Sequence, residues 1–412
     1  REQNEVACSA ECEKIKGSKN LNVPHLRFPE FSGEWEMVSL QDIATINPKS
    51  DPLQNTFIYI DLEAVEKGEL RKIQEIMREE APSRAQRVID NNDILFQCVR
   101  PYQKNNYIHR ILNTSNQQWV ASTGYAQIRT TELPNYIYHL LNTDEFNRKV
   151  MVRCTGSSYP AINSEDLATI HLYYTPDKKE QLKISRLLDL LDKRIATQNK
   201  IIEDLKKLKS AISKHLFARK DLLETTICLS NIATLKNGYA FQSGKYNALG
   251  KWKILTITNV SGERYINDED YNCIINLPND IQDHQVLKEG DILISLTGNV
   301  GRVSLCKDGD YLLNQRVGLL QLAKNVNQEF LYQILSSQRF ENSMIACGQG
   351  AAQMNIGKGD VESYVLPYSS NVNNILLVAK ILHSYDEYII NEQRKLTLLT
   401  MQKQYFLAQM FI

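Results

Sequence analysis

Polar loops carry the residues of this chain that could do chemistry. Residues 100–107 (Arg-Pro-Tyr-Gln-Lys-Asn-Asn-Tyr) combine two basic side chains with amides and aromatic rings, and residues 155–159 (Thr-Gly-Ser-Ser-Tyr) form a small-residue loop that a ligand can approach closely. The corresponding loops of the second half are residues 297–302, 314–316 and 348–353. Such side chains offer paired hydrogen-bond donors and acceptors, which favours recognition over covalent chemistry. For any single residue, an ordinary polar surface turn is an equally good explanation.

Motifs of catalytic sites are missing from the sequence. None of the eleven prolines adjoins another, so the Asn/Asp-Pro-Pro-aromatic pocket with which an adenine methyltransferase holds a flipped base is absent. Gly244-Lys245 is followed by Tyr246, so there is no phosphate-binding loop ending in Gly-Lys-Ser/Thr. The seven histidines lie at no spacing typical of a nucleophile pair, and Cys8 and Cys12 lack a second pair to complete a metal site. We therefore predict recognition without catalysis, and no metal.

Composition limits the classes of protein that fit. A chain of 412 residues with 42% hydrophobic residues suits two globular domains. It contains no run of roughly 18 apolar residues that could cross a membrane, and its first twenty residues resemble no targeting signal, so we expect a cytoplasmic protein with reduced cysteines. The 48 basic and 48 acidic residues cancel, which argues against a protein that coats nucleic acid by charge alone.

An internal duplication sets the expected architecture. Residues 156–217 align with residues 350–411 without a gap, at a displacement of 194 positions. The match continues upstream with small shifts, where residues 40–45 mirror residues 229–234 and residues 93–95 mirror residues 291–293. Because it reaches beyond the amphipathic helices into strand-rich segments, a chance likeness of two helices is the weaker explanation. Identical pairs include Ile162/Ile356, Asp166/Asp360, Leu172/Leu366, Leu188/Leu382, Asp192/Asp386, Ile195/Ile389, Leu205/Leu399, Lys209/Lys403 and Phe217/Phe411.

Each repeat is expected to begin with a mixed α/β domain that positions the polar loops. Short β-rich runs alternate with Gly, Asn, Asp and Pro turns, and helical stretches follow them. The expected strands are residues 57–60, 94–96, 253–258 and 291–295, and the expected helical stretches are residues 136–150 and 328–345.

Each repeat is expected to end in a long helix, from about residue 178 to 217 and from about residue 373 to 411. Apolar residues recur in alternating steps of three and four, and forty helical residues form a rod of roughly 60 Å. We predict that the two rods pair antiparallel and carry the domains at opposite ends; the alternative is that each rod packs only on its own domain. The pairing residues are Leu188, Leu191, Ile195, Ile202, Leu205 and Ile212 in the first rod, and Leu382, Tyr385, Ile389, Leu396, Leu399 and Phe406 in the second.

Several segments in this order resemble the specificity subunits of Type I restriction-modification systems. They are residues 24–35 (Pro-His-Leu-Arg-Phe-Pro-Glu-Phe-Ser-Gly-Glu-Trp), 179–192, 238–243, 290–295 and 298–301, and the resemblance covers Pro24 to Phe411. Two departures stand out. Asn92 occupies the place of Gly290, and the second helix begins with Val372-Asn-Asn-Ile375 in place of a Lys-Glu-Gln lead-in, which leaves its start open.

The resemblance implies a fold and a set of partners. The implied fold is α/β (α+β): two target-recognition domains of mixed structure separated by two long antiparallel coiled-coil helices, in a pseudo-twofold repeat. The implied partners are double-stranded DNA, two methyltransferase (modification) subunits and restriction/translocase subunits, with no membrane. No cofactor is expected on this chain, whereas S-adenosylmethionine, ATP and Mg are expected on the partners. The expected segments are 1–23 (N-terminal, disordered), 24–176 (first recognition domain), 177–220 (first spacer helix), 221–370 (second recognition domain) and 371–412 (second spacer helix).

DNA reading assigns a role to the polar loops, because bidentate contacts to base edges contribute roughly 1 to 3 kcal/mol each. The loops differ in content between the repeats, so we expect an asymmetric, bipartite target with a gap of about six to eight base pairs. Two other interpretations stay open: a Type II specificity chain with a fused restriction-methylation partner, and a coiled-coil scaffold that binds protein. The candidate DNA-binding residues are Arg100, Tyr102, Lys104, Asn105, Asn106, Tyr107, Ser157, Ser158, Tyr159, Asn299, Arg302, Gln315, Arg316, Gln349 and Gln353.

Overall fold

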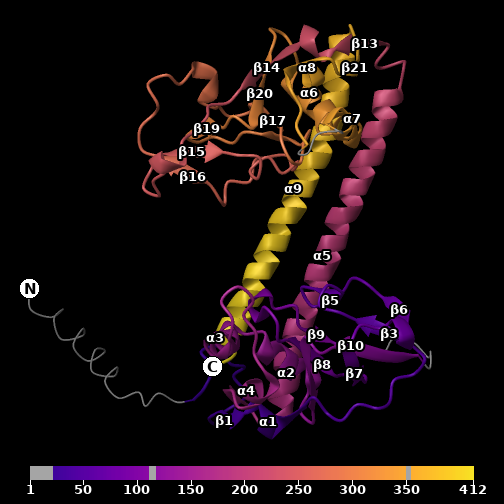
Figure 1. The fold of residues 1–412 in the computed structure, drawn as a ribbon, viewed down its shortest axis with the longest axis vertical. Coiled ribbons are helices and arrows are strands. Elements are labelled where there is room, and N and C mark those ends of the chain that lie inside the picture. The colour runs from indigo at the N-terminus through magenta and orange to yellow at the C-terminus, as the bar shows by residue number, and fades with distance from the viewer. Residues whose placement is uncertain (1–21, 111–116, 349–353) are drawn as a thin grey trace, which may run out of the picture. The chain divides into compact units, whose positions relative to one another are not determined.

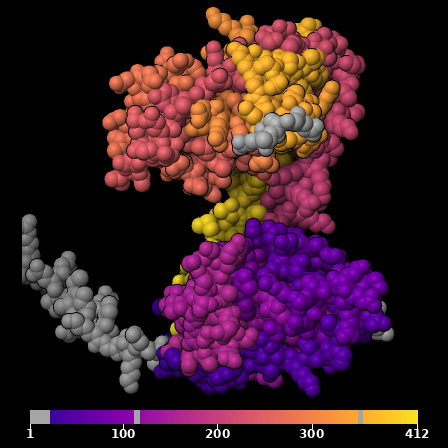
Figure 2. All heavy atoms as spheres, viewed as in Figure 1, coloured from indigo at the N-terminus to yellow at the C-terminus, as the bar shows by residue number. Residues whose placement is uncertain are grey.

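The chain folds into two compact units (Figure 1). The computed structural model describes residues 22–110, 117–348 and 354–412. The first unit comprises the residues up to Thr197 together with Leu396–Ile412, and the second unit comprises Gln198–Lys395. The expectation for residues 1–23 therefore falls almost entirely outside the described residues. Figure 2 shows the described residues of each unit packed as a continuous body.

Two four-stranded sheets build the first unit, in the orders β2-β11-β8-β9 and β6-β3-β10-β7. Strands β3 and β10 are parallel, while β1 and β12 form a separate antiparallel pair. The strands are β1 (Glu36–Ser39), β2 (Ala44–Ile46), β3 (Thr56–Ile60), β4 (Val65–Glu66), β5 (Glu69–Leu70), β6 (Gln74–Met77), β7 (Ala85–Ile89), β8 (Ile94–Gln97), β9 (Tyr107–Ile108), β10 (Gln118–Ser122), β11 (Tyr125–Thr130) and β12 (His171–Tyr174); the helices are α1 (Leu40–Ile43), α2 (Pro134–Leu141), α3 (Asp144–Arg153) and α4 (Ser164–Ala168).

The second unit repeats this topology. Its larger sheet has the order β14-β20-β17-β18, a second sheet has the order β16-β15-β19 with β15 and β19 parallel, and β13 pairs with β21. The strands are β13 (Thr225–Cys228), β14 (Ala233–Asn237), β15 (Trp252–Leu255), β16 (Asn272–Ile274), β17 (Ile292–Ser295), β18 (Val303–Leu305), β19 (Tyr311–Leu313), β20 (Val317–Leu322) and β21 (Val365–Tyr368); the helices are α6 (Gln328–Leu335), α7 (Gln338–Gly348) and α8 (Lys358–Glu362). The equivalent strand order confirms the duplication.

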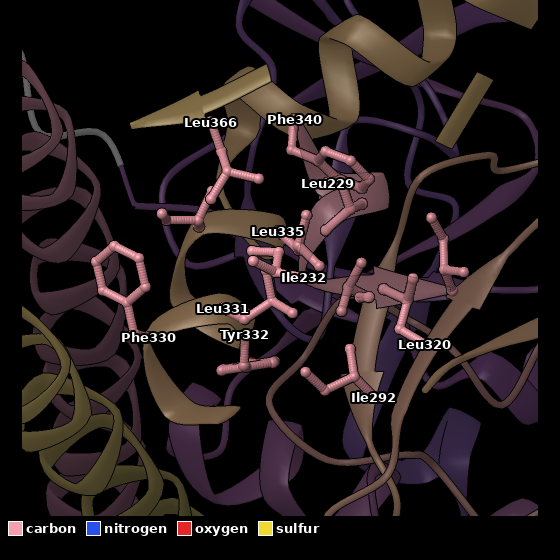
Figure 3. Packing of buried hydrophobic residues seen from close by; sticks show 14 of the residues in the cluster. Leu229, Ile232, Ile292, Leu320, Phe330, Leu331, Tyr332, Leu335, Phe340 and Leu366 are labelled. Atoms are coloured by element: carbon pink, nitrogen blue, oxygen red, sulfur yellow. The ribbon is translucent and has the colours of Figure 1, made fainter. Parts of the chain in front are cut away.

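The core of the second unit shows why these segments fold as they do. Helix α6 buries apolar side chains, including Phe330, Leu331 and Leu335, in this core. Figure 3 shows Leu331 and Leu335 on the side of the helix toward Ile292 of β17 and Leu320 of β20, whereas Phe330 points away from them. Burying each large apolar side chain stabilises the fold by about 1.5–3 kcal/mol, so this face fixes how the helix lies on the sheet.

The expected helical stretches and one expected strand are interrupted by side-chain caps. Residues 136–150 fall into α2 and α3 because the Thr143 hydroxyl caps α3, accepting from Phe146 N over 3.2 Å. Residues 328–345 divide in the same way into α6 and α7. The strand expected to reach Thr258 was wrong in its second half, since β15 ends at Leu255 and Thr256 N donates to Asn259 Oδ1 (2.7 Å) to form a turn.

Two long helices, α5 (Lys178–Ala218) and α9 (Val372–Gln409), each begin in one unit and end in the other. They run antiparallel within each unit: Lys209 lies 2.5 Å from Asp386 in the second, and Lys403 lies 2.5 Å from Asp192 in the first. All twelve predicted pairing residues are buried or half-buried. The predicted fold class is thereby confirmed, and α9 starts directly at Val372.

The last residues of the chain belong to the core of the first unit. Leu26 N donates to Gln409 O over 2.8 Å, and the Phe411 ring lies edge-on to Trp35 with 6.0 Å between centroids. The first unit is therefore assembled from two separate stretches of sequence, whereas the second is one continuous stretch.

Asn92 and Gly290, which differ between the repeats, share an unusual backbone conformation. Their φ angles are +73° and +85°, in the left-handed region. Asparagine tolerates this region better than most side chains, so the substitution preserves the turn that leads into β8 and β17.

Among the described residues, no helix is long and apolar enough to cross a membrane.

Candidate nucleic-acid interface

The structure joins the two polar loops of the first unit. Val99 and Thr155 each form an antiparallel bridge with Ala161, and Arg100 N donates to Pro160 O over 2.7 Å. Arg100 has a left-handed backbone (φ +55°), and its guanidinium lies over the Tyr159 ring, 4.4 Å from the centroid. The cation–π contact holds an arginine and an exposed aromatic ring together on one surface.

The exposed members of this surface suit recognition. The Tyr102 and Tyr159 side chains are 51% and 62% exposed, and Ser157 and Ser158 are exposed beside them. Rings of this kind can stack on bases or sugars, and the hydroxyls can donate or accept hydrogen bonds. Geometry therefore brings together the candidates Arg100, Tyr102, Ser157, Ser158 and Tyr159.

Other predicted residues in this loop face the protein. Lys104 Nζ lies 2.5 Å from Asp144 Oδ1, and Asn105 Oδ1 accepts from Lys67 N over 3.0 Å. Asn106 is buried, with Oδ1 accepting from Gln97 N (2.8 Å) and Nδ2 donating to Asn142 Oδ1 (3.0 Å).

Tyr107 is half-buried in β9, and burial raises the pKa of its phenol. In this conformation the loop is held in shape by Lys104, Asn105, Asn106 and Tyr107. Both the oxygen and the nitrogen of the Asn106 side-chain amide are already hydrogen-bonded within the protein.

The second unit assembles its loops in the same way. Thr297 bridges to Asn355, Gly298 N donates to Met354 O (2.9 Å), and Thr297 Oγ1 donates to Asn355 Oδ1 (3.1 Å). Asn299 is exposed on this surface, while Arg302 is half-buried and its Nε lies 3.4 Å from Glu341 Oε1.

Gln315 and Arg316 are exposed in the turn between β19 and β20. The remaining two candidates, Gln349 and Gln353, lie outside the described residues.

One backbone contact shows that the two loop surfaces are equivalent. Cys98 N donates to Gly124 O over 3.0 Å in the first unit, and Leu296 N donates to Arg316 O over 3.0 Å in the second. The turn before β11 therefore corresponds to the turn before β20. Glycine in one copy and arginine in the other give the equivalent surfaces different chemistry.

Sequence reasoning missed two arginines near the first loop surface. Arg84 is exposed, and its carbonyl accepts from Thr123 N (2.9 Å) in the turn that reaches Cys98. Arg87 lies opposite Ala121 in the β7–β10 pair and is half-buried; its Nε has no partner among the described residues. Burial lowers the pKa of Arg87. Both lie on or beside a strand, where the loop composition used in the prediction gives no signal.

The described residues contain no group of three or more His, Cys, Asp or Glu side chains that could hold a metal ion. The two loop surfaces instead present arginine, tyrosine, serine and amide groups in a fixed arrangement. Two copies of one α/β body, each with such a surface and both sharing a pair of long helices, define a duplicated sequence-reading protein.

Comparison with known proteins gives the family. The model of the Type I restriction modification DNA specificity domain matches twice, at residues 32–207 and 224–401, so the chain belongs to this family. It is the DNA-recognition subunit of a Type I restriction-modification system and a non-catalytic component. This assignment favours the Type I interpretation over a Type II chain or a protein-binding scaffold.

Individual relatives are distant. The chain is 25% identical over 360 residues to the Type I restriction enzyme MjaVIII specificity subunit of Methanocaldococcus jannaschii, covering 77% of this chain and 78% of that protein. It is 24% identical over 196 residues to the HindI specificity subunit of Haemophilus influenzae, covering 46% of this chain and 39% of that protein.

Two solved structures share the fold. The crystal structure of the Type I system S subunit from M. genitalium superposes with a TM-score of 0.57 at 15% identity, covering 95% of this chain and 99% of the other. A chain from a structural study of complex assembly and conformational transition in a Type I system gives a TM-score of 0.56 at 19% identity, covering 93% and 98%.

Proposed function

We propose that each unit reads one half of an asymmetric, bipartite DNA target through its loop surface. The observation that carries this proposal is the equivalence of the Cys98–Gly124 and Leu296–Arg316 contacts, which gives both loop surfaces the same frame and different side chains. Loop surfaces with the same backbone arrangement suit the same kind of ligand. Different side chains on that arrangement suit different base sequences. Arg100, Tyr102 and Tyr159 would act in the first unit, and Asn299, Gln315 and Arg316 in the second.

The helices α5 and α9 would set the gap between the half-sites. The two helices run without a break from one unit into the other, over 41 and 38 residues. The chain therefore passes between the units only as helix. We propose a non-specific gap of about six to eight base pairs, as expected when two modules touch one face of B-DNA about one turn apart. The proposed division of the chain into recognition domains and spacers is residues 24–176, 177–220, 221–370 and 371–412.

Two methyltransferase subunits and restriction/translocase subunits are the proposed protein partners. Both long helices carry large apolar side chains that remain exposed, which is typical of surfaces that bind another protein. S-adenosylmethionine, ATP and Mg would be bound by those partners, and the complex would act in the cytoplasm, where the DNA target lies. The exposed side chains are Leu182, Leu190, Leu398, Met401 and Tyr405 in the first unit, and Ile201, Leu208, Leu376, Leu377 and Tyr388 in the second.

Methylome sequencing of the host, with and without this gene, tests the proposal. We expect one bipartite motif with two different half-sites to lose its methylation when the gene is deleted. Replacing residues 98–107 and 155–161 with those of a relative of different specificity should then change one half-site only. A palindromic motif, or a change in both half-sites, would contradict the division of labour.

A further inference from the structure

A pocket in the second unit occupies the place that an arginine fills in the first. The pocket has a volume of about 400 Å³ and lies where β20 ends, between the turn that precedes β17 and the start of α6. Asp283, Glu289 and Asp291 line it, together with His284, Lys288 and Gln321. Three carboxyl groups against one lysine give the lining a negative balance.

The first unit shows what this position holds when it is filled. Arg129 of β11 grips Asp93 with two hydrogen bonds, Nε to Oδ1 (2.8 Å) and NH2 to Oδ2 (2.7 Å), and donates a third to Asp90 Oδ2 (2.7 Å). Gln127 Nε2 also donates to Asp93 Oδ2 (2.7 Å), and Asp93 is only 1% exposed. These contacts raise the pKa of Arg129. The guanidinium is a built-in ligand of this carboxylate.

Strand register identifies the equivalent residues without any superposition. Arg129 pairs with Thr45, and its neighbour Ile128 pairs with Ile94, directly after Asp93. Gln321 pairs with Thr234, and its neighbour Leu320 pairs with Ile292, directly after Asp291. Gln321 therefore stands where the first unit has Arg129, and Asp291 stands where it has Asp93.

The turn around the aspartate is also retained. Asp93 Oδ2 accepts from Asp90 N over 2.7 Å, and Asp291 Oδ2 accepts from Lys288 N over 2.8 Å. The aspartate carboxylate is thus held by the same turn in both units. The side chains that donate to it in the first unit, Gln127 and Arg129, are replaced in the second by Leu319 and Gln321.

Among the described residues no salt bridge to Asp291 is formed; the charge of Lys288, which is exposed to solvent, acts on it without a direct contact. Burial raises the pKa of Asp291, because it outweighs the hydrogen bond from Lys288 N and the Lys288 charge, which both lower the pKa. A half-buried carboxylate of this kind gains most from a ligand that brings both positive charge and hydrogen-bond donors.

We propose that this pocket binds the guanidinium group of an arginine side chain presented by a partner subunit. The guanidinium would dock on Asp291 as Arg129 docks on Asp93, with Asp283 and Glu289 adding negative charge. The pocket adjoins the start of β17, whereas the loop surface follows the other end of that strand after Ser295. A docked arginine would therefore leave the loop surface of this unit free. The identity of the occupant rests on the proposed assembly with partner subunits, but the chemistry of the pocket does not.

Titration of the full chain with N-ethylguanidinium, followed by calorimetry, tests the pocket alone. Ethylammonium provides the same charge without the planar fork. We expect N-ethylguanidinium to bind more tightly than ethylammonium, and both Asp291→Asn and Gln321→Arg to weaken its binding at least tenfold. Gln321→Arg should also raise the thermal unfolding temperature, because the chain then supplies its own guanidinium. Glu269→Gln, which removes an exposed carboxylate outside the pocket, is the matched control and should bind as the wild type does.

Assembly with the methyltransferase subunit of the same restriction-modification system tests the occupant. Asp291→Asn and Gln321→Arg should each weaken assembly at least tenfold, and Glu269→Gln should not. If N-ethylguanidinium does not bind, or binds equally well to Asp291→Asn, the proposal that this pocket is a guanidinium site is wrong. Normal binding of the probe with unchanged assembly of both variants overturns the partner's arginine as its occupant. Neither measurement involves DNA, so a failure here is distinct from a failure of half-site reading.

Discussion

Lys209 of α5 donates a hydrogen bond to Asp386 of α9, with 2.5 Å between Nζ and Oδ1. Lys403 of α9 and Asp192 of α5 form the same pair in the first unit, also at 2.5 Å. Each helix thus provides the lysine in one unit and the aspartate in the other. The surroundings differ, because Asp386 also accepts from Arg264 (3.0 Å) and Gln333 (2.6 Å) and is only 6% exposed.

Asp386→Asn should destabilise the second unit strongly. Removing this carboxylate leaves the half-buried Lys209 without its partner and the buried Arg264 with Glu329 as its remaining acidic partner, which costs about 3 kcal/mol. Asp192→Asn is the matched control: the Asp192 side chain is 36% exposed, so its loss should cost below about 1 kcal/mol. Urea unfolding of both variants measures the difference, and equal losses would show that the wider network contributes nothing.

Arg100→Ala and Arg316→Ala should each affect a different half-site. Loss of a bidentate base contact costs about 1–3 kcal/mol, and specificity should relax only at the bases read by that unit. Binding of the assembled complex to targets mutated in one half-site measures this. Arg148→Ala, which removes an arginine paired with Glu145 on α3, should leave both half-sites as they are. If either loop variant weakened recognition of both halves equally, the assignment of one loop surface to each half would fail.

Arg87→Met should separate stability from DNA binding. The Arg87 Nε is buried without a partner among the described residues, and its desolvation costs free energy, so an apolar side chain of similar length should leave the unfolding temperature unchanged or higher. If Arg87 contacts a phosphate, the salt dependence of DNA binding should fall by about one unit of slope. Affinity measured over a range of salt concentrations checks this. A lower unfolding temperature with an unchanged slope would show that Arg87 is a structural residue.

His109 should make the first unit sensitive to acid. Its ring is buried beside Trp119, with 4.8 Å between centroids, and neither ring nitrogen has a partner among the described residues. Burial lowers the pKa of His109 to about 4, below its value of about 6.5 in the unfolded chain. The unfolded state binds the proton more readily than the folded state. The free energy of unfolding is therefore undiminished by this group above pH 6.5, and it falls by about 3 kcal/mol in all as the pH drops from about 6.5 to about 4.

Unfolding free energies measured between pH 4 and 7 test this dependence. His109→Phe should remove this part of the acid sensitivity, whereas His171→Gln, at an exposed position, should leave it in place. Identical pH profiles for the wild type and His109→Phe would contradict a buried neutral imidazole.

Shortening both long helices by one heptad should shorten the gap in the DNA target. Removing residues 199–205 and 393–399, which correspond in the duplication, takes roughly 10 Å from each rod. We expect the gap to shrink by about three base pairs, at about 3.4 Å per pair, while both half-sites keep their sequence. Methylome sequencing of a strain with the doubly shortened subunit checks this. Deletion from one helix alone, which breaks the pairing register, should abolish methylation; a new half-site sequence would refute the role of the helices.

The duplication and the long helices could be predicted because both leave marks that local sequence retains. Apolar residues at steps of three and four predict a buried helix face, and a repeat of identical residues predicts a repeat of topology. The division of the loop residues could not be predicted, because an amide or lysine that binds DNA looks the same in sequence as one that holds the loop. Asn106 bonds to Gln97 and Asn142, and Lys104 to Asp144; these partners lie 9 to 40 positions away.

The exchange of Arg129 for Gln321 was also beyond sequence reasoning. Only strand pairing shows that the two positions are equivalent, since the match between the repeats is shifted upstream of residue 156. Composition likewise gave no reason to single out Arg87, which is one of many arginines until the structure shows that its Nε has no partner among the described residues.

The docking of Phe411 against Trp35 sets the order in which the molecule can mature. Residues 198–395 are a single continuous stretch and can complete their contacts as soon as they leave the ribosome. The first unit, although translated earlier, lacks part of its core until residues 396–412 emerge. The half translated first is thus the half completed last, and a newly made chain cannot assemble the whole core of its first unit before residues 396–412 have been synthesised.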